Sequence, residues 1–235
     1  MKKISLVVGG TKGIGKVIVN KLKKRGDKIY TLSRSKEKKN NHFSLDLLGD
    51  LSELNKIKKK FHKKKIDNLI FSQRYRGDLE QMDYGIMLKS TDKIINTLKN
   101  NISKKGSIPV LSSIATTTVV DDQNAEYHYT RGAVESLVRY YAVKLGSKGI
   151  RVNCIQATVI FKPENKKFFS KKNNLTRRII EHITPLNRMG TAEDMANLAN
   201  YLSSDDASYI TGCIIPVDGG ARLTSQEHII KKFLK

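Results

Sequence analysis

Short apolar runs alternate along this chain with longer stretches that have the length and polarity of surface helices. The apolar runs are Ile4–Val8, Ile29–Leu32, Leu69–Phe71, Ile108–Leu111, Ile150–Ile155 and Ile214–Val217. The helix-length segments are Ile14–Lys24, Leu51–Lys63, Lys89–Asn100, Ala133–Leu145 and Ala192–Leu202. Strands separated by helices predict a parallel sheet with helices on both faces. Because such crossovers are right-handed, the pattern favours a doubly wound α/β fold.

The whole chain, 1–235, is predicted to form a single domain. It contains no internal repeat and no linker rich in proline or serine, and its hydrophobic content of 39% is enough to build a core. One segment, 162–188, departs from the alternating pattern because it is rich in Lys and Arg and has weak apolar periodicity. We expect a mobile, partly helical insertion there, between a strand and a helix.

The charge balance is strongly basic. The 44 Lys and Arg residues against 22 Asp and Glu residues give a net charge of +22, which can indicate nucleic acid, a membrane surface or an anionic substrate. The lysine runs at 58–60 and 63–65 contain no interleaved aromatic platform beyond Phe61. The pattern therefore favours solvated helix surfaces, and nucleic-acid binding is not expected as the main function.

The sequence predicts neither a membrane span nor a metal site. No stretch approaches 18 uncharged apolar residues, so no membrane span is predicted. Cys154 and Cys213 lie far apart and follow no metal-ligand spacing, which favours neither a disulfide scaffold nor a metal site. We therefore expect a reduced, cytoplasmic protein without a bound metal.

A glycine-rich turn follows the first predicted strand and opens the first predicted helix. Its sequence is Gly9-Gly10-Thr11-Lys12-Gly13-Ile14-Gly15. Glycine permits the positive φ and the close backbone approach that such a turn needs. The N–H groups at the helix start can then bind the pyrophosphate of a dinucleotide. A purely structural glycine turn is the alternative.

Further motifs occur along nearly the whole chain: 149–153 (GIRVN), 185–190 (PLNRMG), 203–212 (SSDDASYITG) and 217–220 (VDGG). Together with the glycine turn, they resemble the short-chain dehydrogenase/reductase family, closest to its 3-oxoacyl-carrier-protein reductase-like branch. The resemblance implies a Rossmann-type sheet and an NAD(P)-dependent oxidoreductase. It also implies a homodimer or homotetramer formed through the helices that hold Met87–Asn100 and Thr130–Lys144.

The end of the second predicted strand bears on the choice of nicotinamide. An acidic residue there would favour NAD(H) by accepting hydrogen bonds from the ribose 2′-hydroxyl. This chain has Ser33 and Arg34 instead, and Lys12 of the glycine turn is near. Two cations around a 2′-phosphate predict NADP(H), the alternative being a pair of ordinary surface charges. The resemblance adds Asp46 and the backbone N–H of Leu47 as contacts to the adenine.

The catalytic residues of the resembled family are a Ser, a Tyr and a Lys four residues after the Tyr. Here they correspond to Ser113, Tyr127 and Arg131, giving a Tyr-x-x-x-Arg motif. The i,i+4 spacing places Tyr127 and Arg131 on one helical face, whereas Tyr129, a competing candidate, would face away. The implied roles are a hydrogen bond from Ser113 to the carbonyl oxygen, a proton from Tyr127, and ribose binding and tyrosinate stabilisation by Arg131.

Other positions depart from the family pattern. Phe71-Ser72-Gln73-Arg74 replaces Asn-Asn-Ala-Gly, Met87 stands near the usual Asn, and Ile160 is left as a backbone contact for the carboxamide. We therefore predict an NADP(H)-dependent enzyme that reduces a ketone or carbonyl, or oxidises the alcohol, of a small, carrier-linked or nucleotide-linked substrate. The alternative is a catalytically degenerate member that acts as a binding or scaffold subunit.

Overall fold

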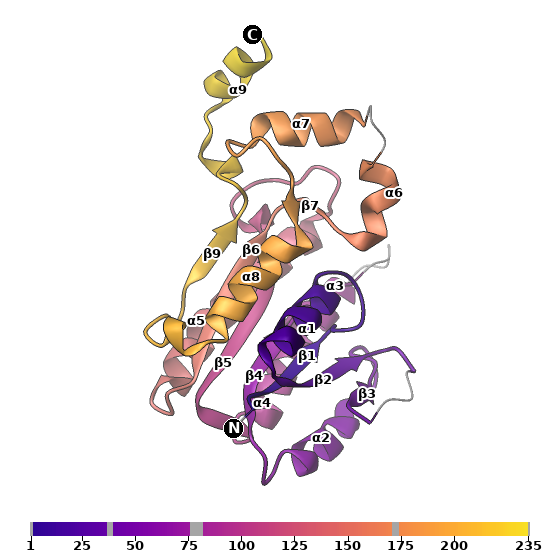
Figure 1. Ribbon diagram of the computed structural model, residues 1–235, viewed down its shortest axis with the longest axis vertical. Coiled ribbons are helices and arrows are strands. Elements are labelled where there is room, and N and C mark those ends of the chain that lie inside the picture. Colours follow the sequence, from indigo (N-terminus) through magenta and orange to yellow (C-terminus); the bar gives the residue numbers. More distant parts are fainter. Residues whose placement is uncertain (1, 37–39, 76–81, 171–173, 235) are drawn as a thin grey trace.

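The computed structural model describes residues 2–36, 40–75, 82–170 and 174–234. In these ranges, the centre of the molecule is a seven-stranded sheet with the order β3-β2-β1-β4-β5-β6-β9 (Figure 1), in which every neighbouring pair is parallel. Its strands are β1 Ile4–Val8, β2 Lys28–Ser33, β3 His42–Ser44, β4 Ile66–Phe71, β5 Ile102–Ser113, β6 Arg151–Ala157 and β9 Ile214–Val217. The predicted doubly wound α/β fold is confirmed.

Helices cover both faces of the sheet (Figure 1). The main helices are α1 Gly13–Arg25, α2 Leu54–Lys60, α4 Ser90–Leu98, α5 Ala125–Gly146 and α8 Ala192–Leu202. Buried side chains of α1 and α8 form one apolar cluster, and those of α2, α4 and α5 form a second cluster against the other face. Within the described ranges, no helix is both long and apolar enough to cross a membrane.

The order of the strands reverses at the centre of the sheet. From β1 the chain goes outward to β2 and β3, and it then returns to β4 on the other side of β1 before continuing outward again. At such a switch point, the connections after the two central strands diverge to opposite faces and leave a crevice at the carboxyl edge of the sheet. The glycine turn after β1 therefore lies beside the residues that follow β4.

Two differences from the predicted elements affect the site. The apolar pattern marks a helix only from Ala133, but α5 begins at Ala125 and so includes Tyr127 and Arg131, because Asn124 caps it by accepting a 2.9 Å hydrogen bond from the Tyr127 N–H. The helix expected from Lys89 is preceded by α3 Met82–Tyr84 and a π-helical turn, η2 Gly85–Lys89. The edge strand β3, which no apolar run indicated, is too short to show a pattern.

The basic segment 162–188 is partly helical. It contains a 3-10 turn, η4 Pro163–Asn165, and the helices α6 Lys166–Phe169 and α7 Leu175–Ile183, while 171–173 lie outside the described residues. Both helices lie beyond the carboxyl edge of the sheet (Figure 1). The segment is bounded by a two-stranded sheet of β7 Ile160–Phe161 and β8 Gly190–Thr191.

The remaining elements are short. They are the 3-10 turns η1 Leu51–Glu53, η3 Ile114–Thr116, η5 Asp205–Ala207 and η6 Ala221–Leu223, and the last helix, α9 Gln226–Phe233. This helix packs against α7, where the rings of Phe233 and His182 lie 4.4 Å apart between centroids. The C-terminal helix thus supports the segment that overhangs the carboxyl edge.

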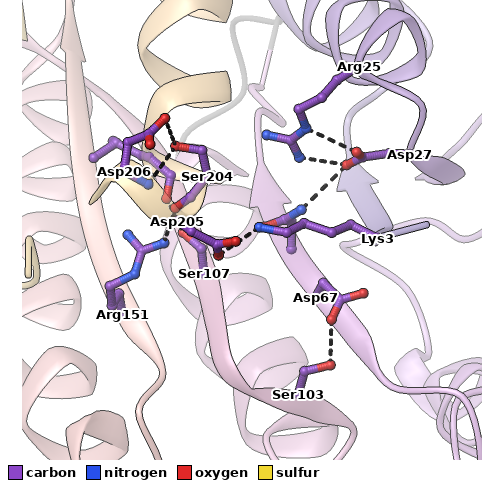
Figure 2. A network of polar contacts seen from close by, with 12 residues as sticks. Lys3, Arg25, Asp27, Asp67, Ser103, Ser107, Arg151, Ser204, Asp205 and Asp206 are labelled. Carbon is purple, nitrogen blue, oxygen red and sulfur yellow. Dashed lines mark hydrogen bonds and ion pairs between the residues drawn. The ribbon is translucent and has the colours of Figure 1, made fainter. Parts of the chain in front are cut away.

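A polar network joins the opposite, amino edge of the sheet (Figure 2). Asp27, before β2, accepts hydrogen bonds from Arg25 at 3.0 and 2.6 Å and from the Ser5 hydroxyl of β1 at 2.5 Å. Asp67 of β4 accepts from the Ile4 N–H at 2.7 Å. Because these carboxylates hold neighbouring strand starts together, the network stabilises the sheet at the edge away from the crevice.

The amino-edge network predicts different costs for two carboxylates. Asp27 has a side chain only 4% exposed, so Asp27→Ala leaves Arg25 and Ser5 without their acceptor and should lower the free energy of unfolding by roughly 2–3 kcal/mol. Asp205 pairs with Lys3 at 2.9 Å but is 87% exposed, so Asp205→Ala should change stability by at most about 1 kcal/mol. Urea unfolding of both variants measures the difference, and equal losses would contradict this account.

Candidate active site

The glycine turn brings the end of β1 into contact with the end of β4. Gly9 has φ of +77°, and a Cβ at this position would lie 2.6 Å from the backbone N of Gln73. A Cβ at Gly15 would lie 2.2 Å from the carbonyl O of Gly9. Only glycine fits either position, so the backbone can fold tightly over the start of α1. No side chain caps this helix at Lys12, and its first-turn N–H groups are open to an anionic ligand.

A pocket of about 570 Å³ opens beside this turn. Lys12 and Arg34 both line it, and both are exposed at its rim. The Thr11 hydroxyl donates a 3.2 Å hydrogen bond to Ser33 Oγ, which fixes the turn against the end of β2. The structure brings together these predicted residues in the lining: Gly9, Thr11, Lys12, Ser33, Arg34, Asp46 and Leu47.

A second pocket, of about 270 Å³, continues along the carboxyl edge. It is lined by the remaining predicted residues Ile14, Ser113, Tyr127, Arg131 and Ile160, whereas Gly13 is buried at the start of α1. Ser72, Gln73 and Arg74 line both pockets. The two pockets therefore adjoin at the end of β4, and an extended ligand can occupy both.

Strand alternation distinguishes the two neighbouring serines at the end of β5. Ser112 donates a 3.3 Å hydrogen bond to the buried Glu135 on α5, which also accepts from Gln156 at 2.8 Å. Ser113 Oγ accepts a 3.2 Å hydrogen bond from the Ala115 N–H. Its own hydrogen remains a donor for a ligand in the pocket. The geometry therefore favours Ser113 over Ser112 as a donor to a substrate.

The start of α5 carries the tyrosine and the arginine. Tyr127 is in the first turn of the helix and lines the second pocket. Tyr129 is 57% exposed and lines neither of these two pockets. Arg131 lies one turn after Tyr127, and its guanidinium carbon is 4.2 Å from the centroid of the Tyr127 ring. The predicted pairing of Tyr127 and Arg131 on one helical face is present in the structure.

Arg131 is buried against a carboxylate that the sequence did not indicate. Its Nη1 lies 2.8 Å from Asp83 Oδ2, and its Nη2 donates a 3.2 Å hydrogen bond to Asp83 Oδ1. Burial raises the pKa of Asp83, although the neighbouring guanidinium acts in the opposite direction. The two residues are 48 positions apart, so no local spacing signals the pair.

The residues that depart from the family pattern lie in the linings of the two pockets. The Gln73 amide nitrogen donates to Thr91 Oγ1 at 2.8 Å and to the Ile86 carbonyl at 3.3 Å, which fixes this side chain against the start of α4. Met87 lies in the π-helical turn and lines the second pocket. Arg74 is exposed where the pockets meet. Gln73 therefore has a fixed place in the lining of both pockets, and Arg74 adds a cation to both.

A histidine shapes the loop that precedes α5. The Val120 N–H donates a 2.9 Å hydrogen bond to His128 Nε2, so Nε2 is unprotonated. His128 Nδ1 then carries the proton and donates to the Asn124 carbonyl at 2.9 Å. Because Val120 and Gln123 line the second pocket, the neutral ring holds part of the pocket wall in place. Sequence reasoning missed this residue.

Buried polar atoms in these pockets fit a polar ligand. Among the described residues, Ser72 Oγ and Gln73 Oε1 have no hydrogen-bond partner, and Arg131 Nη1 has only its ion pair with Asp83. A buried polar atom without a partner is unfavourable unless a ligand or water satisfies it. Together with the open start of α1, these atoms match a dinucleotide that extends along the carboxyl edge.

Comparison with known proteins places the chain among enzymes of this architecture. A sequence model described as enoyl-(acyl carrier protein) reductase matches residues 78–222. The chain belongs to the short-chain dehydrogenase/reductase family. It is 29% identical to the 3-oxoacyl-[acyl-carrier-protein] reductase FabG of Buchnera aphidicola over 95% of the chain and 98% of that protein. It is 25% identical to the 7alpha-hydroxysteroid dehydrogenase of Clostridium sardiniense over 96% of the chain and 95% of that protein.

Solved structures of this family superpose closely. The structure of ElxO with NADP bound has a TM-score of 0.82 and 25% identity, covering 95% of this chain and 100% of that one. A short-chain type dehydrogenase/reductase from Mycobacterium ulcerans has a TM-score of 0.81 and 24% identity, covering 94% and 90%. The resemblance seen in the motifs is confirmed, and the protein is an NAD(P)-dependent oxidoreductase of the short-chain family.

The glycine turn can be tested without knowledge of the substrate. Gly9→Ala should weaken NADPH binding by roughly tenfold or more, because the added Cβ meets the Gln73 backbone and positive φ is unfavourable for alanine. Gly146→Ala, at the end of α5, is the matched control because its Cβ would meet no atom within 4 Å. Fluorescence titration measures both affinities, and unchanged binding by Gly9→Ala would contradict the role of the turn.

Proposed function

We propose that this short-chain enzyme uses NADP(H) to reduce a ketone or other carbonyl, or to oxidise the corresponding alcohol, of a small, carrier-linked or nucleotide-linked substrate. The observation that carries the proposal is that Ser113 and Tyr127 line one pocket that adjoins the pocket of the glycine turn. The proposal treats residues 1–235 as one domain whose segment 162–188 moves over the substrate. A homodimer or homotetramer through α4 and α5 belongs to the same proposal.

The first pocket would hold the adenosine half of the cofactor. The N–H groups at the start of α1 would bind the pyrophosphate, while Asp46 and the N–H of Leu47 would contact the adenine. Lys12 and Arg34 line the same pocket, and their charges suit the 2′-phosphate of NADP(H) better than a free hydroxyl. Ser33 supplies a further hydroxyl and no negative charge that would repel the phosphate.

The second pocket would hold the nicotinamide and the substrate, with Ile160 as a backbone contact to the carboxamide. When bound, the cofactor supplies or accepts the hydride. Ser113 donates a hydrogen bond to the carbonyl oxygen and stabilises the charge that develops there. Tyr127 donates a proton to the same oxygen in reduction and accepts it in oxidation. Arg131 binds the ribose hydroxyls and favours the tyrosinate, although a guanidinium does not relay protons as lysine does.

Cofactor preference tests the assignment of the two cations. Arg34→Asp should weaken NADPH binding by roughly ten- to a hundredfold, because it removes a charge-assisted contact and adds repulsion, and should leave NADH binding unchanged or improved. Lys21→Asp makes the same charge change at an exposed position of α1 outside the pocket and should not alter the preference. Calorimetric titration with both cofactors measures the effect. Equal binding of NADPH and NADH by the unaltered protein would refute the assignment.

Catalysis tests the assignment of Tyr127. Tyr127→Phe should keep NADPH affinity within about twofold and lower kcat by roughly 10²- to 10⁴-fold, since it removes only the hydroxyl that carries the proton. A carbonyl-substrate screen followed by NADPH oxidation measures the rate, and Tyr129→Phe is the control on the same helix. A Tyr127→Phe variant as fast as the unaltered protein would overturn the assignment. Cofactor binding without turnover on any carbonyl would favour the scaffold alternative.

A further inference from the structure

Asp83 lies outside the predicted site, yet it is the residue that engages Arg131. It comes from α3, is 8% exposed, and contacts Arg131 through one ion pair at 2.8 Å and one hydrogen bond at 3.2 Å. The next residue, Tyr84, donates its N–H to Glu126 of α5 at 2.9 Å. Two contacts therefore hold this short helix against the start of α5, where Tyr127 lies.

We propose that Asp83 is a positioning residue that holds the Arg131 guanidinium against the Tyr127 ring and offsets its charge, thereby setting the acidity of Tyr127. The proposal rests on the proposed role of Tyr127 as the proton donor. Asp83 itself lines neither pocket. It contacts Arg131, which lines the second pocket, so its effect on the reaction passes through Arg131.

Asp83 can fix the orientation of the Arg131 guanidinium because of the shape of the arginine side chain. Its long side chain has several rotatable bonds, and its planar fork is fixed only when both terminal nitrogens are engaged. Asp83 faces both of them, and in this orientation the guanidinium carbon lies 4.2 Å from the Tyr127 ring centroid. A carboxylate in this position suits an arginine in particular, because the fork matches its two oxygens.

Asp83 also offsets the charge of Arg131 near the Tyr127 ring. A lone cation over the Tyr127 ring would favour the ionised tyrosine and lower its pKa. The Asp83 carboxylate, 2.8 Å from the same guanidinium, opposes that effect. Other charged or titratable groups lie near Tyr127: Glu126 and His128 on α5, and Arg74, Asp122 and Lys162 in the pocket lining. They stay the same when Asp83 alone is changed, so a shift can be assigned to Asp83.

The test follows the ionisation of Tyr127 in the full-length protein without substrate. Tyrosine labelled with ¹³C at Cζ is titrated by NMR, and the Tyr127 signal is assigned by its loss in Tyr127→Phe. Asp83→Asn should lower the pKa of Tyr127 by about 1 unit, since it leaves the Arg131 charge unopposed. Asp83→Asn combined with Arg131→Gln removes both charges and should restore the pKa to within about 0.3 units of the original value.

Two further variants keep the test decisive. Asp92→Asn removes a carboxylate from α4, where Asp92 accepts a 2.6 Å hydrogen bond from the Tyr141 hydroxyl of α5; it should move the Tyr141 signal and not the Tyr127 signal. If Asp83→Asn fails to fold, Arg131→Gln is compared with the double variant, and Tyr127 should have the higher pKa in Arg131→Gln, where Asp83 is charged. An unshifted Tyr127 pKa in either comparison overturns the proposal.

The pH profile separates this proposal from the proposed function. In Asp83→Asn, the alkaline limb of kcat/KM for carbonyl reduction should move to lower pH by the same amount as the Tyr127 pKa. If the Tyr127 pKa falls but the alkaline limb of kcat/KM does not move, the result would count against Tyr127 as the proton donor. The NMR shift would still support the role of Asp83. An NMR titration without a shift would overturn the role of Asp83 even in a fully active enzyme.

Discussion

The close backbone contact between the glycine turn and the end of β4 is the constraint on which the site depends. Gly9 approaches Gln73 so closely that a single added carbon would lie 2.6 Å from its backbone N. This contact exists because β1 and β4 are neighbours at the centre of the sheet, although α1, β2, β3 and α2 separate them in sequence. It aligns the open start of α1 with Ser72, Gln73 and Arg74, which line both pockets.

The polar residues at the amino edge and at the carboxyl edge of the sheet have different surroundings. At the amino edge, Asp67 accepts a hydrogen bond from β1, and Asp27 accepts hydrogen bonds from β1 and from Arg25 at the end of α1 (Figure 2). At the carboxyl edge, Ser72 and Gln73 keep buried polar atoms without partners among the described residues. A protein tolerates such atoms where a ligand can satisfy them, so Ser72 and Gln73 leave the carboxyl edge able to bind a polar ligand, while Asp27 and Asp67 hold the strand starts together at the amino edge.

The buried ion pair at Arg131 shows how a substitution in a motif can be accommodated. Arginine in place of lysine brings a larger, permanently charged group beneath the tyrosine. In this chain Asp83 faces that group from another helix, and the π-helical turn that follows brings Met87 to the same pocket. Gln73, Arg74, Met87 and Arg131 therefore all lie in the lining of the second pocket.

The sequence by itself determined the parallel α/β fold, the glycine turn and the identity of the Ser113, Tyr127 and Arg131 candidates, because strand and helix periodicity and motif spacing are local properties. It did not determine that Asn124 starts α5 before Tyr127, that Ser112 turns to Glu135, or that His128 holds the loop at Val120. Only the tertiary structure decided that Asp83 pairs with Arg131. The two residues are 48 positions apart and meet because α3 packs on α5, so no local sequence pattern indicates the contact.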